Sequence, residues 1–169
     1  MATTANISMA QCASHYGAVP TPRTYPEGAT QTFVEGEIVV MSAGYLIEIA
    51  SNTPTALIGV AAEDAHNDAT AGTHEVSVNL ASEGTLFKAN LKTTGLASYV
   101  SLAADQGRVA GILRDTTNSI VVLNAAIVGG ASAIVFMHGV DTSLSAIGDT
   151  NASMIFEFLP TYVQFRSTS

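Results

Sequence analysis

The sequence predicts a mainly β fold: a small β-barrel or β-tulip-like domain with one short helix and an extended N-terminal arm. Short segments rich in Val and Ile recur from residue 33 onward, and several of them alternate between apolar and polar residues. Gly, Asn and Asp separate these segments. Strands of this kind at such spacing are typical of barrels and sandwiches. The length of 169 residues is enough for one domain with a buried core.

Residues 1–32 differ in composition from the rest of the chain. They are rich in Ala, Thr, Ser and Pro and show no sustained hydrophobic period. Two interpretations remain open, a leader without fixed structure or an extended arm that becomes ordered on a neighbouring molecule. We therefore expect an arm over 1–32 and a barrel-like domain over 33–169. The expected partner-contact residues of the arm and its junction are Tyr16, Arg23, Tyr25 and Phe33.

The predicted strands follow one another closely along the chain. In order they are FVEGEIVVM (33–41), YLIEIAS (45–51), ALIGVAAE (56–63), HEVSVNL (74–80), TLFKANL (85–91), VAGILRD (109–115), SIVVLN (119–124), SAIVFMHGV (132–140), SMIFEFL (153–159) and TYVQF (161–165). The turn-forming sequences SAG, NTPT, ASEG, TTN and GDTN separate many of them. Segment 74–80 alternates most clearly, with Val76, Val78 and Leu80 on one face.

One helix is expected, over residues 96–105 (LASYVSLAAD), although the β-branched Val100 lowers its helix propensity. Gly107 is placed to cap its C-terminus. The uncharged segment 120–137 reaches the lower length limit for a bilayer span. Its Gly129-Gly130 break and its β-branched residues favour two buried strands joined by a turn, so we expect no membrane segment.

The composition limits the possible partners. Hydrophobic residues make up 47% of the chain and charged residues only 12%, about half the usual charged share. We therefore expect other subunits to cover part of the surface. The net charge is −8 and the six Lys and Arg residues are scattered, which excludes nucleic acid and anionic membranes as expected partners. Cys12 is the single cysteine, so no disulfide forms within the chain, and the N-terminus does not resemble a signal peptide.

One loop concentrates reactive side chains. The stretch from Ala56 to Leu80 contains Glu63, Asp64, His66, Asp68, His74 and Glu75. Three interpretations are a metal site, a catalytic cluster and a solvated turn between two strands. A calcium loop needs Gly and a further ligand where Ala69 and Thr70 stand, and the two histidines do not have zinc-site spacing. We favour the solvated turn and predict no metal ligand or cofactor.

Catalytic motifs are also missing from the sequence. It has no G-x-S-x-G elbow, and GGASA lacks the Lys of a phosphate loop. Cys12 and His15 lie close together, but in the expected arm, where no rigid frame holds a dyad. Glu63 and Asp64 are strand-end neighbours and are expected to point to opposite faces. We predict no catalytic residue and a protein that is not an enzyme.

Three segments carry a resemblance to a known family. They are YPEGATQTFVEGEIVVMSAGYLIEIASNTPTALIGVAAEDA, VNLASEGTLFKANL and GDTNASMIFEFLPTYVQF. In their order and spacing they resemble the head decoration, or capsid cement, proteins of tailed bacteriophages, over roughly residues 25–165. The resemblance implies a small β-barrel or tulip domain without catalytic activity.

The resemblance also implies partners and a location. Proteins of this family form homotrimers on the outer capsid surface of the virion, after synthesis in the host cytoplasm, and clamp neighbouring major capsid protein subunits. An N-terminal arm could add a strand to a capsid sheet edge. The alternative from another class is a carbohydrate- or receptor-binding β module of a phage fibre or baseplate. The absence of Trp and an aromatic share of 7% disfavour that alternative.

Overall fold

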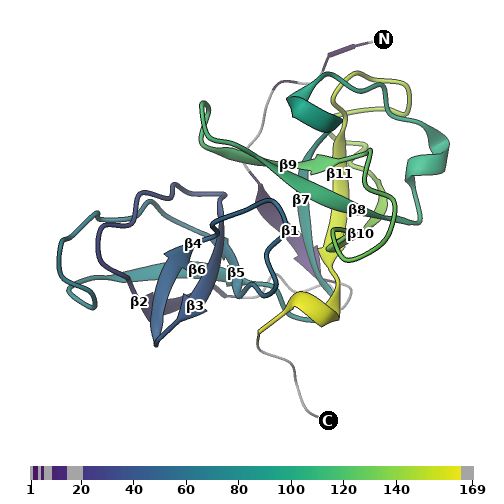
Figure 1. The fold of residues 1–169 in the computed structure, drawn as a ribbon. Helices are drawn as coiled ribbons and strands as arrows, with labels where there is room; N and C mark the ends of the chain where they lie inside the picture. The colour runs from purple at the N-terminus through teal and green to yellow at the C-terminus, as the bar shows by residue number, and fades with distance from the viewer. Residues whose placement is uncertain (1, 4, 6–8, 15–20, 165–169) are drawn as a thin grey trace.

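Eleven strands form two sheets in the computed structural model, which describes residues 2–3, 5, 9–14 and 21–164 (Figure 1). Three short 3-10 turns complete the regular structure of this part of the chain. The fold is therefore mainly β, which confirms the predicted class. No helix of the described chain is long and apolar enough to cross a membrane.

The first sheet closes into a five-stranded ring, which we call the closed barrel. Its strands are β7 (Thr85–Lys92), β8 (Arg108–Asp115), β9 (Ile120–Asn124), β10 (Val135–Val140) and β11 (Ser153–Phe158). Their order is β7-β11-β10-β8-β9, and β9 then pairs in parallel with the end of β7. Closure removes the exposed edges that an open sheet would present. A further strand, β1 (Ala10–Ser14), pairs antiparallel with the first half of β7.

Aromatic and branched side chains fill the closed barrel. The rings of Phe87, Phe156 and Phe158 contact one another, with centroids 5.2–6.0 Å apart. Ile112 and Leu123 are fully buried beside them. These residues occupy alternate positions on their strands, so each strand directs one row of side chains into the core.

The second sheet, which we call the curled sheet, contains the earlier strands. They are β2 (Arg23–Pro26), β3 (Ile38–Ser42), β4 (Tyr45–Glu48), β5 (Gly59–Ala61) and β6 (Glu75–Leu80), in the order β2-β6-β5-β3-β4. The Gly28 N–H donates to the Leu46 carbonyl at 2.8 Å, which brings the two outer strands together. Val76 and Val78 are buried in its core, as the alternation of segment 74–80 predicts, while Leu80 is half-buried.

The two sheets share one apolar core at their junction. Ile38, Ile49 and Leu57 from the curled-sheet half pack in the same cluster as the core of the closed barrel. The backbone of Leu57 also pairs with the C-terminal segment, accepting from Gln164 and donating to Tyr162, each at 2.8 Å. Because apolar surface is buried on both sides of this junction, the two halves hold a fixed orientation.

The closed barrel has two different ends. The curled sheet lies at the end where β8 and β11 finish and β7 begins (Figure 1). The opposite end carries two loops, 93–107 between β7 and β8 and 141–152 between β10 and β11. We call this opposite end the loop end. Residues 2–3 also lie there, since the Thr150 N–H donates to the Ala2 carbonyl at 2.8 Å.

Three sequence predictions are corrected by the structure. Residues 96–105 are not an α-helix: the region forms two 3-10 turns, Thr94–Leu96 and Ala103–Asp105, although Gly107 does adopt a positive φ at the end of the second. TYVQF is not a strand, because Pro160 starts a 3-10 turn, Pro160–Tyr162. A boundary at residue 32 is not observed, because β2 and the buried Glu27 belong to the curled sheet.

Other predictions are confirmed. The uncharged stretch 120–137 forms two buried strands, β9 and the start of β10, separated by the turn at Gly129-Gly130. The two strands do not pair with each other; both pair with β8. Every other predicted strand before Pro160 has a counterpart in the two sheets, with bounds that differ from the predicted ones by up to five residues at either end.

Candidate functional site

The acidic loop joins β5 to β6, and its carboxylates bind backbone groups of the same chain. Glu63 accepts a hydrogen bond from the Ser77 N–H at 2.5 Å, and that bond holds the pKa of Glu63 below its ordinary value. Asp64 accepts from the Glu35 N–H at 2.8 Å. The two neighbouring carboxylates thus have separate partners, as expected for residues that point to opposite faces.

The histidines of this loop are organised by a buried carboxylate. Glu27, which the sequence analysis did not single out, accepts from the His66 and Asn67 N–H groups and lies 2.9 Å from His66 Nδ1. The rings of His66 and His74 stack with centroids 4.3 Å apart, and His74 Nε2 lies 3.6 Å from Asp68. Among the described residues, no group of three or more His, Cys, Asp or Glu side chains could hold a metal ion. The side chains of this loop therefore stabilise a turn between β5 and β6.

The predicted partner-contact residues do not form one surface. Phe33 is 1% exposed in the core of the curled sheet, so it is not available to a partner, and that prediction is wrong. Tyr25 is half-buried against the same core, because β2 pairs with β6. Arg23 is exposed on β2. Tyr16 lies outside the described residues.

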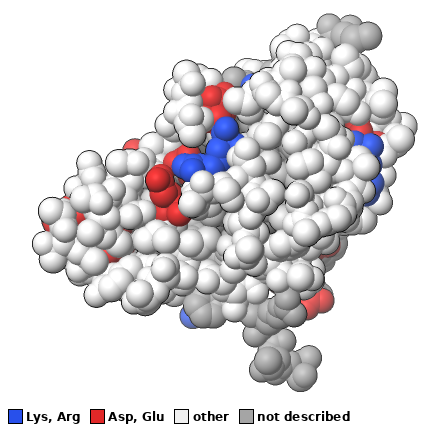
Figure 2. All heavy atoms as spheres, viewed as in Figure 1, with Lys and Arg blue, Asp and Glu red and all other residues white. Residues whose placement is uncertain are grey.

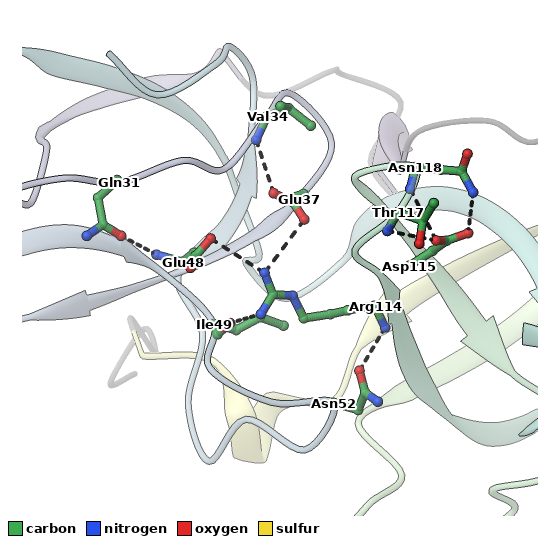
Figure 3. A network of polar contacts seen from close by, with 10 residues as sticks. All are labelled: Gln31, Val34, Glu37, Glu48, Ile49, Asn52, Arg114, Asp115, Thr117 and Asn118. Atoms are coloured by element: carbon green, nitrogen blue, oxygen red, sulfur yellow. Dashed lines mark hydrogen bonds and ion pairs between the residues drawn. The ribbon is translucent and has the colours of Figure 1, made fainter. Parts of the chain in front are cut away.

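A charged network joins the two halves of the molecule (Figure 3). Arg114, near the end of β8, donates through Nη1 to the Ile49 carbonyl at 2.5 Å. Its Nη2 lies 3.5 Å from Glu48 and 3.8 Å from Glu37. The Arg114 N–H donates to Asn52 at 2.7 Å. These contacts connect the closed barrel to β3, β4 and the loop after β4, so the network supports the junction.

A groove of about 410 Å³ runs beside β3 and the end of β4. The side-chain amide of Gln164 lies in it and pairs with both backbone groups of Met41, at 2.8 and 3.0 Å. This amide occupies the position of a neighbouring strand at an edge that β5 is too short to cover. Other polar lining residues are Ser42, Glu48, Ser51, Thr53 and Thr55.

The loop end has the most unusual surface. It carries Val100, Leu102, Leu144 and Ile147, which are 36%, 52%, 48% and 50% exposed. The described chain has two other large hydrophobic side chains at such exposure, Tyr45 and Val128. No charged residue occurs in 94–104 or 142–148. Figure 2 shows the upper right of the molecule, where these loops lie, as mostly uncharged apart from its right edge.

Backbone hydrogen bonds hold the two loops side by side. The Ser101 N–H donates to the Asp149 carbonyl at 3.1 Å, and the Gly148 N–H donates to the Ser101 carbonyl at 3.0 Å. Ser101 itself is buried. Leu102 and Ile147, which follow Ser101 and precede Gly148 in the sequence, are therefore exposed on two adjoining loops.

Polar groups support the loops from beneath. Asp105 is fully buried, accepts from the Leu102 N–H at 2.7 Å and pairs with Arg108 at 3.0 Å. Burial, followed by the charge of Asp105, raises the pKa of Tyr99, whose hydroxyl donates to Asp105 at 3.2 Å. The loop end thus has polar side chains inside and apolar side chains outside. This is the reverse of the usual distribution.

Asp141 fixes the second loop in the same way. It accepts from the Ser143 N–H and hydroxyl at 3.1 and 2.6 Å, and it lies 3.6 Å from Lys88 Nζ. Burial acts to raise the pKa of Asp141, but these hydrogen bonds and the Lys88 charge outweigh it, so the pKa lies below its ordinary value. The apolar side chains are therefore presented on a preorganised backbone.

The sequence analysis did not identify the loop end. The segment 96–105 contains two of its four exposed apolar residues, Val100 and Leu102, but the sequence analysis assigned that segment to a helix. The available signal was the occurrence of Leu and Ile in two charge-free segments, 94–104 and 142–148, which are rich in Ser and Ala and in which no strand would bury these side chains.

Comparisons with protein-family models, with curated proteins and with solved structures return no match.

Proposed function

We propose that this protein is a non-enzymatic structural protein that binds the outer surface of a tailed-phage capsid as a homotrimer. In this role it stabilises the assembled shell by clamping neighbouring major capsid protein subunits. The observation that carries the proposal is the loop end, a surface that carries few charges and has four exposed large apolar side chains. A surface of this composition is typical of a protein that works in contact with other proteins.

The distribution of charge supports the same role. Residues 21–82, which include the curled sheet, contain eight Asp or Glu residues and one basic residue, Arg23, a formal charge of −7 within the total of −8. The molecule is thus strongly acidic in its curled-sheet half, whereas residues 94–104 and 142–148 of the loop end carry no charge. An acidic outer part stays solvated and repels free copies, while an apolar part supplies contact area.

Multivalency provides the stabilising mechanism. Each subunit needs only weak affinity, because three linked subunits raise one another's effective concentration at the capsid. Every bound trimer then favours the assembled shell over dissociated subunits by linkage. No chemical step is required of any side chain, and the carboxylates Glu63, Asp64 and Glu27 serve the fold by accepting backbone hydrogen bonds.

Co-sedimentation with empty expanded capsids tests the proposal. The full chain is expected to pellet with capsids to a saturating stoichiometry and to raise their thermal disruption temperature. Protein incubated without capsids is the control for aggregation. Protein that remains in the supernatant at all capsid concentrations contradicts the proposed function.

The carbohydrate- or receptor-binding alternative has one feature in its favour, the polar groove beside Gln164. No aromatic side chain lines the described part of that groove, so a stacking platform for a sugar ring is missing there. A glycan array distinguishes the two functions, because binding to a defined glycan together with absent capsid binding favours the alternative.

A further inference from the structure

We propose that the loop end is the surface through which copies of this chain bind one another. The inference rests on the homotrimer of the proposed function and names the surface through which its subunits contact one another. In that homotrimer, the exposed patch formed by Val100, Leu102, Leu144 and Ile147 meets the same patches of the other two copies around a three-fold axis.

The charge distribution selects this mode of association. Two copies that approach with their curled sheets facing each other bring together two units of formal charge −7. Copies that meet through residues 94–104 and 142–148 bring together segments without charged residues, with Asp149 and the Asp105–Arg108 pair as their charged neighbours, and the curled sheets then lie at the far ends of the assembly (Figure 1). Because like charges repel more weakly at larger separation, the loop-end contact is the electrostatically favoured one.

The patch is also suited to a contact with its own copy. An apolar surface needs no complementary charge or hydrogen-bond pattern on the partner, so the same patch from each of three copies can meet at a three-fold axis. The ladder between Ser101, Gly148 and Asp149 holds it in shape before binding, which lowers the entropic cost of association.

Light scattering and sedimentation equilibrium of the full chain test the inference. The wild-type protein is expected to be oligomeric, with a mass that falls on dilution. Leu102→Asp and Ile147→Asp each place charges face to face in the contact and are expected to weaken association by at least about tenfold. Both positions are about half exposed, so the fold is expected to tolerate the change. Leu102→Ser is a milder variant that removes the apolar contact without adding charge.

Val128→Asp is the matched control. Val128 is 58% exposed, belongs to the loop between β9 and β10, and lies outside the patch. The control is expected to remain oligomeric. Higher salt is expected to strengthen wild-type association, because it screens the repulsion between curled sheets and leaves an apolar contact intact.

A wild-type chain that is monomeric at every concentration overturns the inference. Loop-end variants that stay oligomeric, or a control that dissociates equally, also overturn it. Failure of the proposed function has a different signature: an oligomer that depends on Leu102 and Ile147 but does not bind capsids. A monomer that binds capsids leaves the capsid function standing and removes the loop-end contact.

Discussion

Several carboxylates in this chain accept hydrogen bonds from the backbone of the loop beside them. Asp115 shows the pattern clearly (Figure 3): it accepts from the Thr117 and Asn118 N–H groups, each at 3.2 Å, and from the Asn118 side-chain amide at 2.8 Å. These bonds, with the Asn118 side chain as the largest contribution, hold its pKa below the ordinary value of 3.8. Each such loop is therefore stable only while its carboxylate is ionised.

Acidification is expected to destabilise the fold. The pKa values of Glu63, Asp115, Asp141 and Asp149 are all lowered in the folded protein, so folding favours their ionised forms. Their contribution is complete above the pKa of the unfolded chain and is lost as the pH falls through the lower pKa of the folded state. The thermal unfolding midpoint temperature, followed by circular dichroism, should therefore decrease as the pH is lowered below about 4. A midpoint that stays constant or rises on acidification contradicts this expectation.

The substitution Asp115→Asn tests how much one of these carboxylates contributes to the free energy of unfolding. The variant cannot accept the same set of hydrogen bonds, and we expect a loss of about 1–2 kcal/mol in the free energy of unfolding at neutral pH. Its acid-induced loss should be smaller than that of the wild type. Glu83→Gln, at an exposed carboxylate, is the control and should follow the wild-type pH profile.

At the level of elements, hydrophobic alternation predicts the central strands well but misses two edge strands, β1 and β2. Segment 74–80 alternates because one face meets the core and the other does not. β1 (AQCAS) and β2 (RTYP) show no alternation, yet they are strands because their backbones pair with β7 and β6. Backbone pairing at a sheet edge depends on the partner strand, and the local residue pattern does not predict it.

The loop end could not be predicted for a related reason. Val100 and Leu102 are apolar, and the sequence alone does not show which apolar residues are buried in the folded chain. Their exposure follows from the inward position of Asp105, which binds the Leu102 N–H and pairs with Arg108. That position depends on the closure of the barrel around residues far apart in sequence.

A close strand approach gives a prediction at the element scale. A Cβ atom on Gly59 would lie 2.2 Å from the carbonyl oxygen of Asn79 on the neighbouring strand β6. Gly59→Ala should force β5 away from β6 and lower the free energy of unfolding by about 1–3 kcal/mol, measured by denaturant titration. Gly129→Ala is the matched control, since a Cβ there meets no atom within 4 Å, and its effect should stay within about 0.5 kcal/mol. Equal effects of the two substitutions argue against the close approach.

For the whole molecule, the continuous core and the Arg114 network make the two halves one cooperative unit. Ile49 contributes to both features, since its side chain lies in the shared core and its carbonyl accepts from Arg114. We therefore expect a single unfolding transition for the curled sheet and the closed barrel.

Arg114→Met tests the network. It keeps the apolar stem and leaves Glu37, which is almost fully buried, without its cationic neighbour. The free energy of unfolding should fall by about 3 kcal/mol, as for the loss of one partner from a buried ion pair. Arg23→Met, at the exposed arginine on β2, should have little effect. An equal loss in both variants means that the junction does not depend on Arg114.

The order of strands in the closed barrel has a consequence for biosynthesis. β11 lies between β7 and β10, yet it is synthesised after every other strand of the described chain. Until it emerges, β7 and β10 each expose an unpaired edge next to Phe87 and Met137, and the nascent polypeptide is prone to aggregate. The barrel half can therefore complete its fold only after β11 has been synthesised, and until then a chaperone that shields these edges would be of most use.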